Sequence, residues 1–296
     1  MDTFRSKSGN APGCGNAAGV ICEVVPDMQP GDLFTELDEA ALSRSHLRAV
    51  LASGMGFFTD AYDLFVIGIV STLITKDWHL GSSQLAILNS TMLAAAFLGA
   101  LVFGRYADIV GRKRVYWMVA VIMIAGALGS ALSGSFWMLI GFRFLLGFGV
   151  GGDYPVSAVM VSEYANRKDR GKLVGMVFGT QALGLIVGPL IALALLGSGV
   201  SGDTAWRVLL GLGALPAAAV IYLRCRMPES PRYRVQVREA PAHARMGLSA
   251  FLTNRRWLIT LAGTAGCWFL LDYAYYGNTI STPQILGLIS PHASTM

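Results

Sequence analysis

The side chains in this sequence that could do chemistry are ionisable groups placed within long apolar stretches. An ionisable group at membrane depth is costly unless it is paired, hydrated or protonated, so each one is a functional candidate by default. The set comprises Asp60, Asp63, Arg143, Asp153, Glu163 and Asp272. From charge alone, a cavity lined mainly by carboxyl groups favours a cation or a polyol over an anion.

Three of the acids have informative neighbours. Asp60 and Asp63 lie three residues apart and therefore share one face of a helix, although one of them could be only an end cap or a helix-packing partner. Asp153 follows a glycine-rich run and precedes Pro155, which cannot donate its amide to the turn before it. This pattern predicts a free carbonyl and a carboxyl close together near the middle of the membrane.

A polar stripe marks the last apolar segment. Trp268, Asp272 and Tyr276 are spaced i, i+4 and i+8, so they lie along one side of a helix and must face protein or water rather than lipid. Both aromatic residues could also be ordinary packing side chains. Gln181, in an earlier apolar segment, adds an amide that both donates and accepts hydrogen bonds.

Simpler interpretations are open for two ionisable residues. Arg143 could extend its side chain to the membrane surface or pair with a carboxylate. Glu163 stands near the end of its apolar segment, where it is interfacial or paired with Arg167, four residues later.

The elements that position these residues follow from composition. The 296 residues are 54% hydrophobic and only 14% charged, with a mean hydropathy of +0.54, whereas soluble chains carry roughly 25% charged residues. This composition predicts an all-α polytopic membrane protein and disfavours disordered chains, DNA-binding modules and surface-charged globular enzymes.

A membrane-crossing helix needs about 20 mostly apolar residues. Windows of at least about that length occur at 49–75, 84–104, 115–133, 136–164, 172–198, 206–224 and 257–281.

Basic residues orient these seven spans. Nearly all of the 23 Lys and Arg residues, Arg224 among them, fall in segments on one side, whereas Lys76 and Arg207 fall on the other. Because cytoplasmic segments retain Lys and Arg, we expect a cytosolic N-terminus and, after seven spans, a C-terminus outside. The expected domains are a cytosolic tail, 1–48, a six-helix bundle, 49–224, a basic cytosolic linker, 225–256, and a seventh span with a truncated end, 257–296. The tail contains either a short amphipathic helix or only solvated chain.

No enzyme is predicted. Gly-x-Ser-x-Gly, His-Glu-x-x-His and Walker motifs do not occur, and the four histidines lie in loops, in tails or at their edges. The four cysteines show neither metal-ligand spacing nor a disulfide framework. We therefore expect no cofactor, no metal and no nucleic-acid partner, and self-association stays open.

Several motifs resemble a known superfamily. GRYADIVGRKR at 104–114, Arg143 followed by glycines at 147, 149 and 151, and PESPRY at 228–233 resemble three motifs of the major facilitator superfamily. GMGFFTDAYDLF at 54–65, and GGDYP at 151–155 with SEYAN at 162–166, resemble the phosphate:proton symporters of that superfamily. The resemblance implies the N-terminal six-helix bundle of that fold plus one additional helix, with the C-terminal half largely missing.

The resemblance also implies roles for individual residues. Phosphate contacts are implied for Tyr154, Gln181, Trp268, Asp272 and Tyr276. Proton coupling is implied for Asp60 or Asp63, together with Asp153. A cytosolic gating latch is implied for Gly104, Asp108, Gly111, Arg112 and Lys113. Phosphate and carboxyl groups are compatible because a protonated acid donates a hydrogen bond to the anion, whereas an ionised acid repels it.

These implications lead to a functional hypothesis with two alternatives. The hypothesis is inorganic phosphate:proton symport by alternating access across the plasma (cell inner) membrane, carried out by a truncated chain whose partners are phosphate, protons and the lipid bilayer. One alternative is a related proton-coupled sugar or organic acid symporter. The other is a membrane protein, or remnant, that binds phosphate without transporting it.

Overall fold

The computed structural model describes residues 38–225 and 248–289, and these residues form an all-helical bundle. Seven helical stretches in this part of the chain are long and apolar enough to cross a membrane, which confirms the predicted class and number of spans. The helices are α2 (Arg44–Trp78), α3 (Ser82–Val110), α4 (Arg112–Ala131), α5 (Phe136–Tyr164), α6 (Arg170–Gly197), α7 (Gly202–Leu212), α8 (Ala214–Cys225), α10 (Leu248–Thr253) and α11 (Arg255–Ile289). Most of the predicted tail and linker, at 1–37 and 226–247, lies outside the described residues, as does 290–296.

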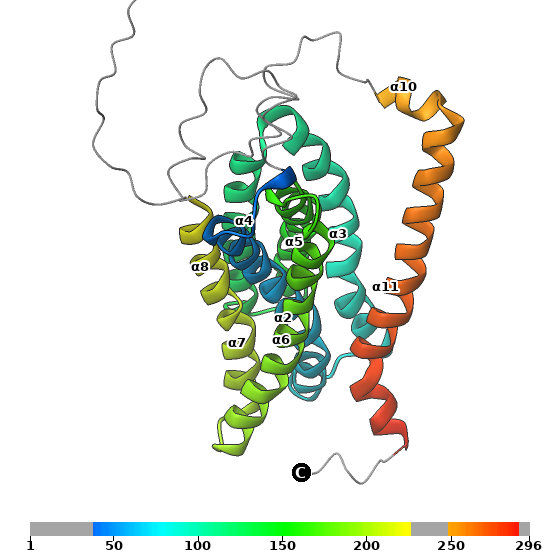
Figure 1. Cartoon of the computed structure of the whole chain (residues 1–296). Coiled ribbons are helices and arrows are strands. Elements are labelled where there is room, and N and C mark those ends of the chain that lie inside the picture. Colours follow the sequence, from blue (N-terminus) through cyan, green and yellow to red (C-terminus); the bar gives the residue numbers. More distant parts are fainter. Residues whose placement is uncertain (1–37, 226–247, 290–296) are drawn as a thin grey trace, which may run out of the picture.

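Helices α2 to α8 pack together, and α11 stands along one side of them (Figure 1). Helix α5 is central to the packing, with α3, α4 and α2 against it. The glycines of α5 permit the close approach of α3, because a Cβ on Gly151 would collide with the backbone carbonyl oxygen of Ala96. Glycine at this position thus serves helix packing, as the motif suggests.

The sixth span, expected at 206–224, is one membrane-crossing stretch, Gly202–Arg224, with a local break at Gly213, whose φ of -58° and ψ of -26° remain helical. Helix α7 ends at Leu212 and α8 begins at Ala214, with Gly213 between them. Pro216 explains the break, because proline has no amide proton to donate to the carbonyl of Leu212 four residues earlier. The break lies at the level of Asp63, whose carboxyl occupies the position that a Cβ of Gly213 would take.

The turn between α3 and α4 depends on one glycine. Gly111 has φ 108°, a conformation that favours glycine over residues with a Cβ. It separates Val110, the last residue of α3, from Arg112, the first of α4. The glycine predicted in the gating loop therefore makes a tight reversal between two spans.

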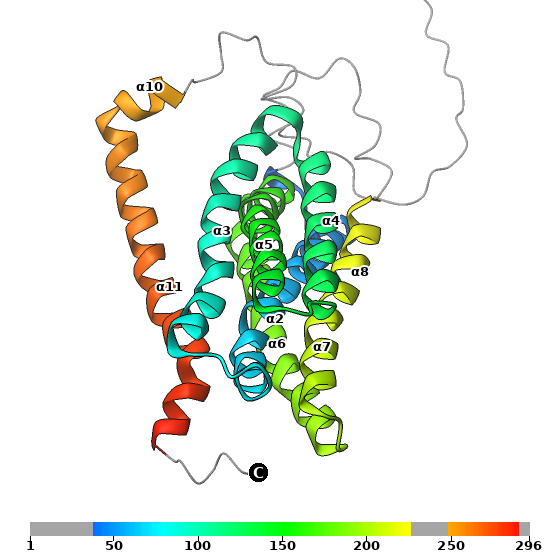
Figure 2. The same cartoon turned by 180° about the vertical axis from the view of Figure 1, so that it is seen from behind.

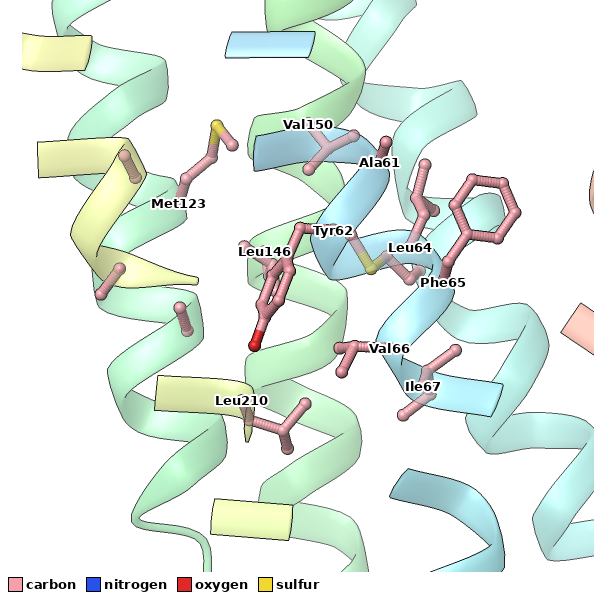
Figure 3. Close-up of a cluster of buried hydrophobic side chains, with 14 of the residues drawn as sticks. Ala61, Tyr62, Leu64, Phe65, Val66, Ile67, Met123, Leu146, Val150 and Leu210 are labelled. Carbon is pink, nitrogen blue, oxygen red and sulfur yellow. The ribbon is translucent and has the colours of Figure 1, made fainter. Parts of the chain in front are cut away.

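The core consists of buried apolar side chains from α2 and the helices that surround it, and Figure 3 shows part of it around Tyr62, Leu146 and Leu210. Tyr62 is 2% exposed, and its hydroxyl donates a hydrogen bond to the Leu209 carbonyl at 2.7 Å. This bond satisfies the one polar atom of a buried aromatic side chain and ties α2 to α7.

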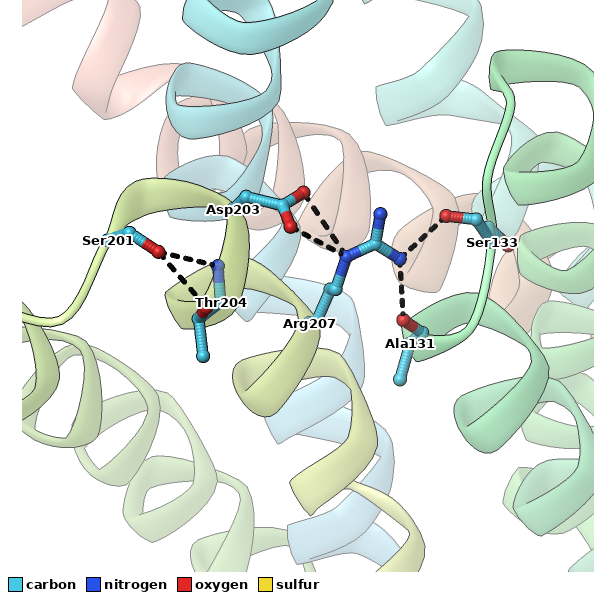
Figure 4. A network of polar contacts seen from close by, with 6 residues as sticks. All are labelled: Ala131, Ser133, Ser201, Asp203, Thr204 and Arg207. Carbon is cyan, nitrogen blue, oxygen red and sulfur yellow. Dashed lines mark hydrogen bonds and ion pairs between the residues drawn. The ribbon is translucent and has the colours of Figure 1, made fainter.

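Arg207 joins α7 to the connection between α4 and α5 (Figure 4). Its Nη1 donates to the carbonyl oxygens of Ala131 and Ser133 at 3.0 and 2.7 Å, and its Nε contacts the Asp203 carboxylate at 3.1 Å. At the start of α7, the Ser201 hydroxyl accepts from the Thr204 amide, as an N-cap does. Helix α7, the first half of the sixth span, is thus fixed to the α4–α5 connection.

Helix α11 has much less packing than the other spans. Its contacts with the bundle are mainly with α2, and only Ile280 among its described side chains is buried. Aromatic side chains mediate the contact: the ring centroid of Phe65 lies 5.5 Å from those of both Tyr275 and Tyr276. Figure 2 shows α11 leaning away from the bundle toward its α10 end.

Candidate functional site

A buried ion pair between α5 and α8 lies at the centre of the candidate site. Arg224 Nη1 is 2.5 Å from Asp153 Oδ1, and Nη2 donates to Oδ2 at 3.0 Å. The side chains are 4% and 0% exposed, respectively. Ser157 donates to Asp153 Oδ2 at 3.1 Å, and the guanidinium carbon lies 3.7 Å from the ring centroid of Tyr116. Paired geometry of this kind lets two charges persist in a low-polarity interior.

The role of Arg224 differs from the sequence-based interpretation, which counts it among the basic residues on the cytosolic side. The arginine is almost fully buried because α8 packs against α4 and α2, and its side chain crosses the Tyr116 ring to reach Asp153 of α5. The available signal was its position directly at the end of an apolar span, where the long side chain can turn inward as well as outward.

Asp60 lies beside this ion pair. The residue is fully buried in the middle of α2, and its carboxyl interacts electrostatically with both Asp153 and Arg224. With both acids ionised, neither Asp60 oxygen finds a hydrogen-bond donor among the described residues. A proton on one of the two acids converts their contact into a carboxyl–carboxyl hydrogen bond. The arrangement can therefore hold a proton between Asp60 and Asp153.

The approach of α2 to the ion pair requires a glycine one turn before Asp60. A Cβ on Gly56 would overlap Arg224 Nη2 and Asp153 Oδ2. Gly56 thus allows the backbone of α2 to lie directly against both charges, which brings Asp60 within reach of them.

Asp63 lies in a different environment from Asp60. Its carboxyl faces Gly213, at the break in the sixth span, and interacts with Arg143. Arg143 is fully buried and donates from Nη2 to the Asp63 backbone carbonyl at 2.9 Å. Arg143 is therefore paired rather than extended to the surface, and neither acid of α2 is an end cap.

A second polar cluster connects α5, α6 and α11. Gln181 Nε2 donates to the Tyr154 hydroxyl, and that hydroxyl lies 3.0 Å from the Tyr276 hydroxyl. Asp272 interacts with both tyrosines and with the Trp268 side chain one turn before it. The structure thus brings together all five residues predicted to contact phosphate.

This cluster adjoins the buried acids and is open on one side. Tyr154 and Tyr276 both interact electrostatically with Asp60. Aromatic rings enclose part of the cluster: Phe57 packs 4.7 Å from Tyr154, and Phe178 packs 5.4 Å from Trp268. Trp268 remains 46% exposed. The arrangement of this cluster suits a polar ligand held between α5, α6 and α11, next to an acid that can bind a proton.

The predicted gating loop forms a charge network at the α3–α4 turn. Arg112 Nη1 contacts Asp108 at 2.6 Å, and Nη2 contacts Glu163 at 3.2 Å. Arg112 is thus a partner for Glu163 that sequence spacing did not suggest. Because Glu163 belongs to α5, one guanidinium joins three spans. An added Cβ at Gly104 would meet no atom within 4 Å, so packing in this structure does not require that glycine.

Comparison with known proteins places the chain among membrane transporters. The family model described as sugar (and other) transporter matches residues 49–256. The chain is 34% identical to the probable inorganic phosphate transporter 1-3 of Arabidopsis thaliana, over 91% of this chain and 64% of the relative. It is also 34% identical to inorganic phosphate transporter 1-1 of the same plant, over 88% of this chain and 62% of that one. The chain therefore spans somewhat less than two thirds of the relatives it matches.

The fold also matches solved transporter structures. The major facilitator superfamily proton:xylose symporter XylE superposes with a TM-score of 0.57 and 22% identity, over 64% of this chain and 46% of the other. At this identity the likeness shows the fold alone, a major facilitator helix bundle.

Proposed function

Because the chain belongs to the sugar (and other) transporter family, we propose that it provides the phosphate site and the proton-binding acids of an inorganic phosphate:proton symporter. The observation that carries the proposal is the contact of buried Asp60 with the Asp153–Arg224 ion pair, next to the cluster of Tyr154, Gln181 and Tyr276. The resemblance of 34% to transporters named for inorganic phosphate supports the choice of substrate.

The chemistry of the cluster is consistent with an oxyanion. Tyrosine hydroxyls, the Gln181 amide and the indole of Trp268 all donate hydrogen bonds, and the oxygens of phosphate accept them. Asp272 and Asp60 oppose an anion when ionised and add donors when protonated. Arg224 is neutralised by Asp153, so it does not by itself offset the negative charge of the ligand.

Proton binding then precedes phosphate binding. A proton taken up between Asp60 and Asp153 removes one negative charge from the neighbourhood of Tyr154 and Tyr276. Loss of that proton restores the repulsion and favours release of the anion. Coupling of this kind is symport when the site opens to each side of the membrane in turn.

We assign the end of the bundle that carries Arg44, Arg112 and Arg224 to the cytosol, because basic residues gather at this end. The C-terminal end of α11 then lies outside.

At the cytosolic end, the Asp108–Arg112–Glu163 network acts as the latch. Replacing Arg112 with Gln should speed amide hydrogen exchange at the α3–α4 turn, whereas Arg114→Gln, an exposed neighbour, should leave it unchanged. Unchanged exchange in the Arg112 variant would remove the latch role.

The decisive experiment is uptake of labelled phosphate into proteoliposomes that contain only the purified 296-residue chain, with an inward proton gradient. We expect uptake that depends on the gradient and that arsenate, but not xylose, inhibits. Inhibition by xylose and not by arsenate would favour the sugar alternative.

Equilibrium binding of labelled phosphate in the same preparation separates the remaining alternatives. Binding without uptake would support a phosphate-binding chain that does not transport alone. Neither binding nor uptake, from protein shown to be folded by a cooperative thermal transition, would overturn the proposal.

A further inference from the structure

A cavity of about 520 Å³ lies between α4 and α8 and adjoins the candidate transport site at Arg224. Among the described residues its walls are formed by Lys113, Arg114, Trp117, Met118 and Arg224. Figure 2 shows α4 and α8 side by side, and the cavity lies where α4 begins and α8 ends. This is the end of the bundle that carries most of the basic residues.

The charge of the cavity favours an anion. Of the five lining residues that the structure describes, Lys113, Arg114 and Arg224 are cationic and none is acidic, so the lining stays positive even after Asp153 has offset the charge of Arg224. The amino end of α4, which begins at Arg112, adds the partial positive charge of a helix terminus. Arg224 contributes a further feature: it is 4% exposed, yet its Nε has no hydrogen-bond acceptor among the described residues. A buried donor of this kind gains a partner when an anion enters.

The remaining walls distinguish a lipid from a soluble anion. Trp117 is 52% exposed on the outer surface of α4, and Met118 lies half-buried beside it. Tryptophan is enriched at the level of lipid headgroups, where its ring meets both apolar chains and water. Basic pockets between spanning helices on the cytoplasmic side are suited to anionic headgroups. A free inorganic ion has no apolar part that could pack against Trp117 and Met118, whereas the acyl chain of a lipid does.

We propose that this cavity binds the phosphate group of an anionic phospholipid, with Arg114 and Lys113 at the headgroup and Trp117 beside the upper part of an acyl chain. The site reaches the transport machinery through Arg224, whose two terminal nitrogens hold Asp153. A lipid phosphate at the cavity therefore shares this guanidinium with Asp153, through the Nε atom that Asp153 does not contact.

Native mass spectrometry of the full chain in detergent tests the proposal by titration with short-chain phosphatidylglycerol and, separately, with phosphatidylcholine. We expect phosphatidylglycerol to bind more tightly than phosphatidylcholine. Arg114→Gln should weaken phosphatidylglycerol binding by about fivefold, since one interfacial cation contributes about 1 kcal/mol. Lys172→Gln is the matched control, because it removes an exposed cation near the same end but on α6, and it should leave binding unchanged.

Three outcomes would overturn the proposal. Equal binding of the two lipids would show that the cavity does not select charge. An equal loss in the Lys172 variant would show diffuse attraction rather than a site. Displacement of the lipid by excess inorganic phosphate, with the same sensitivity to Arg114→Gln, would assign the cavity to the free anion. Because Arg114 is exposed, we expect its variant to unfold at the wild-type temperature, which keeps the comparison interpretable.

Discussion

Arg143 holds Asp63 through the main chain: its Nη2 donates to the Asp63 carbonyl oxygen at 2.9 Å, and its charge also faces the Asp63 carboxyl. Both residues are fully buried. Helix α5 thus supports α2 at the level where the sixth span is broken. The acid that adjoins the break is held apart from Asp60, which adjoins the Arg224 ion pair.

Replacing Arg143 with Met should lower the free energy of unfolding by about 3–5 kcal/mol, because the Asp63 carboxyl then stays buried without its cation. The measurement is denaturant unfolding in detergent micelles. The double variant Arg143→Met with Asp63→Leu should recover much of the loss, since no charge remains buried. A single variant as stable as the wild type would contradict the assigned pairing.

Replacing Gly213 with Ala should destabilise the protein by about 1–3 kcal/mol, because the new Cβ would occupy the position of the Asp63 carboxyl. Gly179→Ala is the control: it lies inside α6 with no atom within 4 Å of an added Cβ. That control should be neutral or stabilising, since alanine favours a helix over glycine by about 0.5–1 kcal/mol. Equal thermal unfolding temperatures for the two variants would show that the contact between Gly213 and the Asp63 carboxyl has room for a methyl group.

Asp60→Asn should weaken the pH dependence of phosphate binding. In the wild type, binding should fall as pH rises, because Asp60 then loses its proton and repels the anion. Asparagine keeps the shape of the protonated acid and cannot ionise. The check is equilibrium binding of labelled phosphate across a pH series. A wild-type pH dependence that persists in the variant would assign the proton to another group.

Tyr276→Phe should weaken phosphate binding by about five- to tenfold, the effect of losing one hydrogen bond of about 1–1.5 kcal/mol. Its hydroxyl is the one that lies 3.0 Å from the Tyr154 hydroxyl. Tyr275→Phe is the matched control: Tyr275 directly precedes Tyr276 in the same helix and packs against the same ring, Phe65. Similar losses in both variants would indicate a packing role for this part of α11.

The seven spans could be predicted from sequence because membrane-spanning length and apolar composition are properties of each segment alone. The sixth span is confirmed as well, and only its local break at Gly213 was not predicted, because the effect of Pro216 on the Leu212 carbonyl is a backbone effect that a hydropathy window does not detect. The direction of a side chain could not be predicted either. Arg224 counts as a surface cation by position, and only the packing of α8 on α4 and α2 turns it toward Asp153.

The candidate site was predicted in a different way. Spacing identified the stripe on α11, and resemblance to symporters linked it with Tyr154 and Gln181; neither explains why Tyr276 reaches Tyr154. That contact depends on where α11 packs against α2, through Phe65. Such placement is a property of the whole bundle and carries no local signal.

The two pieces of the sixth span are anchored at opposite ends. Arg207 fastens α7 to the backbone at Ala131 and Ser133, while Arg224 fastens α8 to an acid in the interior of α5. Gly213 separates the two anchors. The two ends of the span are therefore held by partners of different kinds: loss of Arg207 should loosen α7 from a backbone turn, whereas neutralising Asp153 should loosen the end of α8 from a buried charge.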